Sequence, residues 1–584
     1  GYPLWDLSGN VNPTVLDEIA RYHEVILDAN PITPYRPDVA LALRARRPDI
    51  RLLAYVTGHS NWFAAQPDST VHFPTRYWRL VRDLDGFLYN TGGGQYGSQS
   101  SQAGNINLAK RDGTGRFIVA ERIADLFYDS IVRSGIWDGV FVDVFCDNML
   151  WMEASGEIVD ITRAGYPDRT AFAAAWKTAS DTLASRLRRL SGPTQILAGN
   201  CAAGTKYAWF NGWMRENFPY QGGGTWSTNM YSDPGGYFVD EQRWLTPRHN
   251  FIYSASSGLN QPYSTTNMRK ARFGLGTASL GTGYAAIGNA ARVSRNEQFM
   301  AWWYDEYAVN LATGAASTQL QHTGWLGQPL GDFYQMVWIG ATPDAVTNPG
   351  FETSVTSGWD LATNLGSTAT RDTVSAPVGN ASVRITCPTA VPAVPWATVY
   401  RTTTGIPVTA NGEYAATFWA RSQAPRTIEV VAGGMSGGVS YARLVLSIDQ
   451  TWRRYQVILR PNQTATARLD LMLAGMAGDV WFDDVHFQAG ANSVYRRDFQ
   501  NGMVLVNPGA TPQDVVMERT VQRIAGFRDP TVNSGASGTT HRVGASDALF
   551  LIGGDTTPPA AIRDLRPVPP GTPATRGTPP RMDR

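Results

Sequence analysis

Eight short apolar runs alternate with helical patterns along the first 310 residues, and this alternation constrains the fold more than any other feature. The runs occupy residues 3–8, 24–30, 51–58, 137–145, 195–200, 212–217, 250–256 and 283–288. Intervening segments such as 117–132 and 169–190 carry apolar residues three and four apart, which is typical of amphipathic helices. Repeated strand–helix units predict an α/β fold, and eight of them predict a closed (β/α)8 TIM barrel over residues 1–325. An open doubly wound sheet is the alternative, but no GxGxxG follows the first run.

The pattern changes near residue 345. Helical spacing ends there, and short strands separated by Gly, Asn and Pro turns continue to about residue 490. We therefore expect residues 347–490 to form an all-β module. Residues 554–584 are rich in Pro and lack periodicity, which predicts a linker or tail.

Composition excludes several classes of partner. The net charge of +1 provides no basic field for nucleic acid, and no apolar run is long enough for a membrane span. The chain opens at Gly1 without a signal-like leader, which we interpret as a mature or trimmed form. The 19 Trp and 24 Tyr exceed what a core needs, and sugar-binding clefts use such rings for stacking. The sequence carries no signal of oligomeric state.

The three cysteines are too few for a disulfide framework and show no CxxC metal spacing. We expect buried free thiols, with Cys146 and Cys201 on neighbouring strands as the exception left open. HExxH and Walker motifs are absent from the sequence, and the seven histidines show no ligand spacing.

Two carboxylates stand at the ends of predicted strands. Asp143 follows a nearly continuous apolar run, where a buried charge costs several kcal/mol unless it is paired or belongs to a site. Glu216 ends the sixth run, so both carboxylates belong to the same rim of a barrel. Glycoside cleavage needs two carboxyl groups on either side of the scissile bond, and this pair fits that need. A structural Asp143, hydrogen-bonded to loop amides, is the alternative.

Further polar and aromatic residues lie at strand ends, in adjacent loops or in the aromatic segment 301–307. The candidates for substrate binding are Asp6, Asp28, Tyr55, Asp147, Asn148, Asn200, Tyr220, Trp226, Trp303 and Asp305. Asp147 is the main rival of Asp143, and Tyr220 and Trp226 are expected to be exposed stacking platforms. Segment 301–307 could equally be a barrel helix that packs its rings into the core, and the polar residues could equally cap helices or satisfy loops.

Three further segments carry resemblances to known modules. TNPGFETSVTSGWD at 347–360 and VWFDDVHF at 480–487 resemble the first and last strands of bacterial carbohydrate-binding modules with a jelly-roll β-sandwich. That resemblance implies a structural calcium ion near Glu352 and Asp484, with ordinary turn carboxylates as the alternative. YRRDFQNGMVLVNP at 495–508 resembles the hairpin that closes bacterial hydrolase-like barrels. It implies that 326–346 and 491–553 form one small β domain around an inserted sandwich at 347–490, although a tandem order is simpler.

The DGVFVD strand and the glutamate on strand six are similar to hypothetical bacterial glycoside hydrolases with TIM barrels, distantly related to clan D alpha-galactosidases. This resemblance implies Asp143 as nucleophile or base and Glu216 as general acid, with no catalytic cofactor; clan D has Asp on strand six. It implies a secreted or cell-surface hydrolase of a polysaccharide or exopolysaccharide, endo-acting because binding modules favour polymers. A non-catalytic carbohydrate-binding surface protein and a transglycosidase that uses the same pair are the alternatives.

Overall fold

The computed structural model forms two compact units. It describes residues 2–4, 13–28, 37–62, 73–97, 103–201, 204–219, 225–257, 261–288, 302–336, 344–436, 438–489 and 494–553. Unit 1 comprises Gly1–Gly324 and Ile524–Gly535, and unit 2 comprises Trp325–Arg523 and Ala536–Arg584. Within these described ranges, the helices lack the length and hydrophobicity that crossing a bilayer requires.

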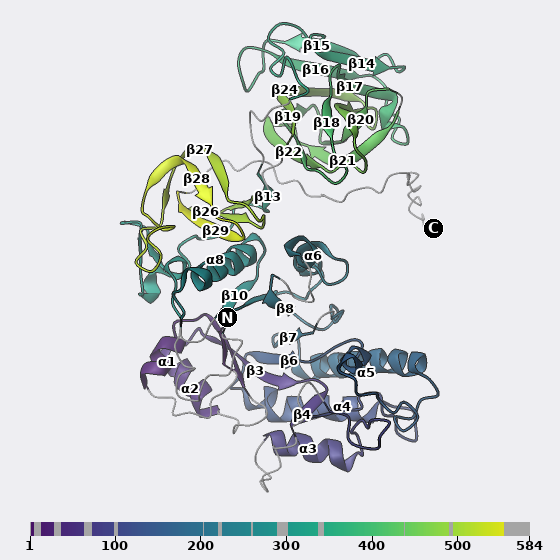
Figure 1. Cartoon of the computed structure of the whole chain (residues 1–584), viewed down its shortest axis with the longest axis vertical. Coiled ribbons are helices and arrows are strands. Elements are labelled where there is room, and N and C mark those ends of the chain that lie inside the picture. Colours follow the sequence, from purple (N-terminus) through teal and green to yellow (C-terminus); the bar gives the residue numbers. More distant parts are fainter. Residues whose placement is uncertain are drawn as a thin grey trace, which may run out of the picture. The chain divides into compact units, whose positions relative to one another are not determined.

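Unit 1 is built on an eight-stranded, entirely parallel sheet (Figure 1). Each of the eight predicted runs overlaps one of its strands, so the eight predicted strands are confirmed. In sheet order they are β1 (Tyr2–Leu4), β2 (Glu24–Asp28), β3 (Arg51–Thr57), β6 (Gly139–Asp143), β7 (Ile196–Asn200), β8 (Gly212–Phe218), β9 (Phe251–Ala255) and β10 (Tyr284–Gly288). Glycine begins β8 because a Cβ on Gly212 would lie 1.8 Å from the His249 carbonyl oxygen.

The sheet is strongly curled. Seven strand spacings would separate the edges of a flat sheet by about 34 Å, yet Cα atoms of β1 and β10 approach within 8 Å. Side chains also meet across the curl. Glu24, on β2, and His249, just before β9, are fully buried, and Glu24 Oε2 lies 2.9 Å from His249 Nδ1. The curl gives the sheet an inner face, on which Ile26, Leu53, Phe141, Ala198, Met214, Phe251 and Tyr253 pack together.

Helices follow most of the strands and pack on the outer face. They are α1 (Pro13–Ile19), α2 (Pro37–Arg46), α3 (Phe73–Asp83), α4 (Ile118–Ser130), α5 (Arg169–Ser191), α6 (Trp226–Tyr231), α7 (Tyr237–Glu241) and α8 (Thr265–Leu280). The sequence sets their boundaries: the Asp168 carboxylate caps α5 by accepting from Ala171 N–H. Phe172, Trp176, Leu183 and Leu187 then bury one face of α5, as its apolar spacing predicts.

Short elements complete unit 1. β4 (Ser60–Trp62) pairs with β5 (Ala103–Asn105), and β11 (Val309–Asn310) pairs with β12 (Ala315–Ala316). Single 3₁₀ segments are η2 (Val132–Ser134), η3 (Leu150–Ser155), η5 (Asp305–Tyr307) and η6 (Leu320–His322). The described part of segment 301–307 is therefore one 3₁₀ turn rather than a barrel helix.

Unit 2 contains a sandwich of two antiparallel sheets over residues 359–489. One sheet has β14 (Trp359–Thr363), β17 (Thr398–Thr402), β23 (Ala465–Met472), β20 (Arg426–Gly434) and β21 (Ser440–Ile448), with β18 (Ile406–Val408) also on β23. The other has β15 (Thr368–Asp372), β16 (Ser382–Cys387), β24 (Gly478–Ala489), β19 (Tyr414–Ser422) and β22 (Arg453–Leu459). Alternate residues of both sheets form a buried core that includes Trp359, stacked on Tyr400 at 4.8 Å between ring centroids.

A third antiparallel sheet in unit 2 joins segments on both sides of the sandwich in the sequence. Its strands are, in order, β13 (Tyr334–Gln335), β25 (Tyr495–Asp498), β26 (Gly502–Asn507), β29 (Asp547–Ile552), β27 (Gln513–Arg523) and β28 (Ser537–Val543). β13 precedes the sandwich and pairs with β25, which follows it, through Tyr334–Arg496 and Gln335–Tyr495.

Candidate active site

Four polar side chains stand on the inner face of the curled sheet, at the carboxyl ends of neighbouring strands. Side chains alternate between the faces of a strand, so the residue two positions after an inward apolar residue also faces inward. Leu53, Phe141, Ala198 and Met214 face inward, and Tyr55, Asp143, Asn200 and Glu216 follow them on β3, β6, β7 and β8. The structure thus brings together both carboxylates and two of the predicted substrate-binding residues.

These four side chains are linked by hydrogen bonds. Tyr55 Oη donates to Asp143 Oδ2 at 2.6 Å, and Asn200 Nδ2 donates to Glu216 Oε2 at 3.0 Å. Asn200 also lies near enough to the Asp143 carboxyl to lower its pKa, so one amide interacts with both acids. Its side chain is buried, and its Oδ1 has no hydrogen-bond partner among the described residues. The amide therefore orients the Glu216 carboxylate and leaves an acceptor free for a ligand.

Burial raises the pKa of Asp143 to about 6, from an ordinary value of 3.8. Hydrogen bonds from Tyr55, the Val144 backbone and Asn200 oppose that rise, whereas the nearby negative charge of Glu216 adds to it. Asp143 and Glu216 are each part-buried, so solvent or a ligand can reach them.

The backbone after each carboxylate adopts a left-handed conformation. Val144 has φ of 49° and Asn217 has φ of 55°. Such a φ is costly for a β-branched residue, and strain of this kind concentrates at functional sites. The β8–β9 pairing also shifts register between Arg215 and Phe218, and irregularities of this kind re-aim side chains beside active sites. Both carboxylates therefore sit where regular strand geometry is interrupted.

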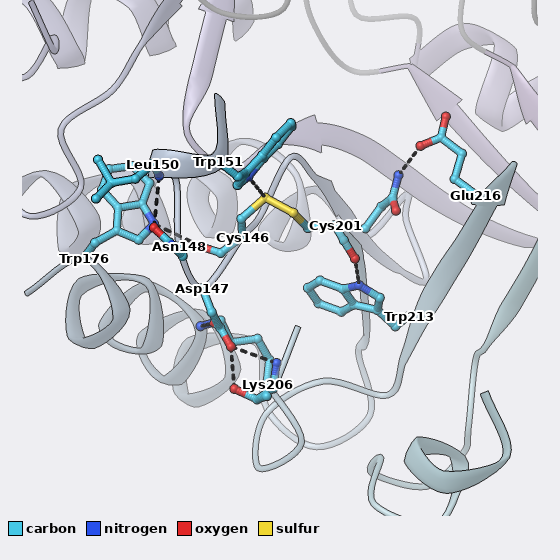
Figure 2. Close-up of a disulfide and its surroundings, with 12 residues drawn as sticks. Cys146, Asp147, Asn148, Leu150, Trp151, Trp176, Cys201, Lys206, Trp213 and Glu216 are labelled. Atoms are coloured by element: carbon cyan, nitrogen blue, oxygen red, sulfur yellow. Dashed lines mark hydrogen bonds and ion pairs between the residues drawn. A yellow bond between two sulfur atoms is a disulfide. The ribbon is translucent and has the colours of Figure 1, made fainter. Parts of the chain in front are cut away.

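Cys146 and Cys201 form a disulfide, which corrects the prediction of free thiols (Figure 2). Cys146 lies three residues after Asp143, and Cys201 directly follows Asn200. The two Cα atoms are 5.3 Å apart because β6 and β7 are neighbours in the sheet. Cys387, in the sandwich, is a buried free thiol as predicted.

Asp147 is held by neighbours rather than directed at a ligand. It forms ion pairs with Lys206 and, at 3.9 Å, with Lys177, and accepts a hydrogen bond from the Thr205 N–H. The Lys206 side chain is fully buried and also pairs with Asp181 at 2.6 Å. These cations and hydrogen bonds lower the pKa of Asp147 despite its partial burial. The rival of Asp143 is therefore one member of a buried ionic cluster.

Several other predicted binding residues have structural partners instead. Asn148 Oδ1 accepts from Leu150 N–H at 3.0 Å, a local turn contact. Trp226 is buried, not an exposed platform, and its Nε1 donates to Thr277 Oγ1. Trp303 is buried and donates to the Ser317 carbonyl, which is the core packing that was the alternative for this segment.

Asp305 is likewise buried, and its carboxylate accepts from the N–H groups of Phe527, Arg528 and Asp529, a structural role rather than a ligand contact. The Asp28 backbone ends β2 in register with Tyr55. Asp6 and Tyr220 lie outside the described residues.

In the sandwich, the predicted calcium ligands do not pair as expected. Asp484 Oδ1 lies 3.2 Å from His486 Nε2 and has left-handed φ of 48°, whereas its neighbour Asp483 faces Glu352. A Cβ on Gly350 would lie 3.7 Å from Asp483 Oδ1 and 3.8 Å from Glu352 Oε1, so both carboxylates border one space. Burial raises the pKa of Asp483 to about 6, and Asp484 and Glu352 add to that rise. Asp483, which the sequence analysis does not single out, is thus the carboxylate that shares this space with Glu352.

Comparison with known proteins identifies a family for part of the chain. Residues 44–341, just over half of its 584 residues, match the model of hypothetical glycosyl hydrolase family 15. No curated protein matches. An arabinose-bound α-L-arabinofuranosidase structure matches over 25% of this chain and 26% of its own length, at 15% identity and a TM-score of 0.22. The CBM22-1 xylan-binding domain from Paenibacillus barcinonensis matches over 26% of this chain and 97% of its own length, at 16% identity and a TM-score of 0.21.

The ionic cluster around Lys206 generates a stability prediction. Lys206→Met leaves two part-buried carboxylates without their buried cation, and we expect it to lower the free energy of unfolding by about 3 kcal/mol. Lys177→Met is the matched control: its side chain is 39% exposed, so the loss should stay below about 1 kcal/mol. Urea unfolding followed by tryptophan fluorescence measures both. Equal losses of unfolding free energy in the two variants would show that Lys206 does not stabilise this cluster more than Lys177 does.

Proposed function

We propose that this chain, which belongs to hypothetical glycosyl hydrolase family 15, is a glycoside hydrolase that cleaves a polysaccharide or exopolysaccharide. The observation that carries the proposal is the carboxylate pair on the inner face of the sheet, with the buried Asn200 amide donating to Glu216 and lowering the pKa of Asp143. Most glycoside hydrolases need two carboxyl groups at one site, one as general acid and one as nucleophile or base. We further propose endo-action, because an attached sugar-binding sandwich would favour polymers.

The proposed architecture is a closed (β/α)8 barrel with an inserted module. The approach of β1 and β10 and the Glu24–His249 contact across the sheet support closure. The pairing of β13 with β25 supports a small β domain of residues 326–346 and 491–553, interrupted by the sandwich at 347–490. We propose that the sandwich is a jelly-roll carbohydrate-binding module.

In the proposed mechanism, Asp143 acts as nucleophile or base, and Glu216 acts as the general acid that protonates the departing glycosidic oxygen. Charge on the sugar then develops towards an oxocarbenium ion, which the negative Asp143 stabilises. Tyr55 holds the Asp143 carboxylate by donating to Oδ2. Asn200 holds the Glu216 carboxyl by donating to Oε2 and offers its unpartnered Oδ1 to a sugar hydroxyl. No step of this scheme calls for a cofactor.

A secreted or cell-surface location follows from the same observations. The Cys146–Cys201 bond would persist in an oxidising compartment and be reduced in most cytosols. Polysaccharide substrates are met outside the cell. The disulfide therefore supports an extracellular site of action.

Substitution of either carboxylate tests the assignment. Asp143→Asn and Glu216→Gln should each reduce polysaccharide cleavage on the order of 10²–10⁴-fold, the contribution of a positioned acid or base. Reducing-end release across a polysaccharide panel measures this, with circular dichroism to confirm folding. Asp129→Asn, on an exposed carboxylate of α4, is the control and should retain activity. Folded variants with wild-type rates would remove the pair from the mechanism.

The pH profile tests the roles. Asp143 must be ionised to act as nucleophile, so kcat/KM should fall as pH drops through about 6, the raised pKa of that carboxyl. Tyr55→Phe removes a hydrogen bond that lowers this pKa, so the acid limb should move to higher pH. The measurement is kcat/KM between pH 4 and 9 for both proteins. An acid limb near pH 4 in the wild type would contradict the assigned role.

We also propose a structural calcium ion in the sandwich, held by Glu352 and Asp483 rather than Asp484. Asp483 and Glu352 border one space, and burial together with neighbouring acids raises the pKa of Asp483, which fits a carboxyl that a cation would neutralise; Arg371 lies 3.5 Å from the Glu352 carboxylate but not beside Asp483. The described residues contain no cluster of three or more His, Cys, Asp or Glu side chains able to hold a metal, so backbone oxygens would complete the shell. Calcium would supply charge neutralisation and join the segments around residues 352 and 483.

Calcium dependence of stability tests this site. The wild type should unfold at a higher temperature in calcium chloride than in EDTA, because a ligand bound only by the folded state stabilises it. Asp483→Asn should abolish that difference, whereas Asp484→Asn should retain it. Differential scanning calorimetry measures the shifts. Identical melting in calcium and EDTA would argue against a bound ion.

A further inference from the structure

One exposed tryptophan lies directly beside the disulfide at the proposed active site. Trp151 is 45% exposed and belongs to η3, which follows β6 and Asp143. Its indole Nε1 donates to Cys146 Sγ at 3.3 Å (Figure 2). The ring therefore presents an apolar surface to solvent while its polar edge is fixed.

The disulfide that anchors this ring is itself held by two buried tryptophans. Trp176 Nε1 donates to the Cys146 carbonyl at 3.0 Å, and Trp213 Nε1 donates to the Cys201 carbonyl at 2.8 Å. Both indoles are almost completely buried. The backbone on either side of the sulfur bridge is thus fixed from the core, and Trp151 rests on a rigid support. A ring ordered in advance loses little entropy when a ligand binds.

The same bridge connects the strand ends that carry the proposed chemistry. Cys146 is three residues from Asp143, and Cys201 directly follows Asn200, which donates to Glu216. Figure 2 shows Trp151 beside the Cys146 sulfur and Glu216 beyond Cys201. The exposed ring, the disulfide and the carboxylates therefore belong to one rim of the sheet.

We propose that Trp151 is a sugar-stacking platform next to the cleavage point and that the Cys146–Cys201 disulfide is its positioning element. The inference rests on the proposed hydrolase function and adds a binding subsite to it. The exposed indole face binds the C–H face of a pyranose ring, while the Nε1–H bond to sulfur sets the tilt of the indole. Single exposed aromatic residues are common on protein surfaces. Trp151 differs from these because its indole N–H is held by the Cys146 sulfur and because it follows β6, the strand that carries Asp143.

The proposal makes substrate binding sensitive to reduction. A dithiol or phosphine reductant supplies two electrons and two protons reach the sulfurs, which gives two thiols on the protein and an oxidised reductant. The connection between the ends of β6 and β7 is then lost, and Cys146 no longer has a fixed place beneath Trp151. The carboxylates stay on their strands, so the change falls on binding more than on the chemical step.

Wild type is first screened on hexasaccharides of cellulose, xylan, mannan, chitin and polygalacturonate. KM and kcat are then measured for each variant on the hexaose that wild type cleaves fastest. Trp151→Ala should raise KM about tenfold and change kcat little, which corresponds to the loss of one stacking contact. Trp151→Phe should restore most of the binding because it keeps an aromatic face. Phe527→Ala, on a 47% exposed aromatic residue of unit 1 outside the sandwich, is the control and should leave KM on the hexaose unchanged.

Reduction supplies the second arm. Tris(2-carboxyethyl)phosphine should raise the wild-type KM, and so should the Cys146→Ser, Cys201→Ser double variant. Neither change should raise KM further in Trp151→Ala, because the platform is already absent. A KM rise of equal size with and without Trp151 would overturn the positioning role of the disulfide.

Other outcomes separate this proposal from the proposed function. If Trp151→Ala has an unchanged KM on a hexaose that the wild type cleaves, the stacking role of Trp151 is overturned, whereas the proposed hydrolase function is not. A fall in kcat without a change in KM also overturns it, because Trp151 would then support the site without touching sugar. If the wild type cleaves neither a hexaose nor a polysaccharide, the proposed hydrolase function is overturned, and so is the Trp151 subsite that rests on it.

Discussion

The curl of the parallel sheet is the constraint on which the site depends. Asp143 and Glu216 stand on strands separated by β7, and only a curled sheet turns both side chains towards the same interior. The fully buried Glu24–His249 contact helps to fix that curl, because it joins β2 to the chain entering β9. Breaking one partner of such a pair leaves a buried polar group without compensation, which costs far more than the intact contact gains. The inner face is therefore defined at its base by packing and this contact, and at its rim by hydrogen bonds around Asn200.

Much of this arrangement could be predicted from the sequence because strands impose a period of two. The run GVFVD places Phe141 and Asp143 on one face, and Met214 and Glu216 follow the same rule on β8. What the pattern does not contain is the partner of each side chain. Asp143 and Asp147 are both acids after the same strand, yet only Asp147 meets Lys206, which arrives from a loop almost 60 residues later. Likewise, the Cys146–Cys201 bond depends on how two strand ends align across 55 residues.

In the sandwich, a local irregularity in β24 interrupts the alternation of core-facing residues that the sequence pattern predicts. Along β24, Val480 and Phe482 face the core, but after Asp484 the core positions become Val485 and Phe487. The register with β19 shifts at this point, and Asp484 takes a left-handed φ. An extra residue in one strand changes the parity of all that follow. The motif FDDV therefore presents two adjacent acids, and the backbone irregularity decides that Asp483, not Asp484, faces Glu352.

The rim of the parallel sheet combines strain with reinforcement. Val144 and Asn217 hold backbone conformations that cost free energy, and such conformations persist only where the surroundings dictate them. Here the surroundings are unusually rigid: a disulfide joins two strand ends, and indole N–H groups hold the carbonyls of both cysteines. Reinforcement of this kind lets a site keep a half-buried carboxyl with a raised pKa beside a second acid without relaxing away from it. The chain thus places its rigidity where two carboxyl groups, Asp143 and Glu216, are kept close together.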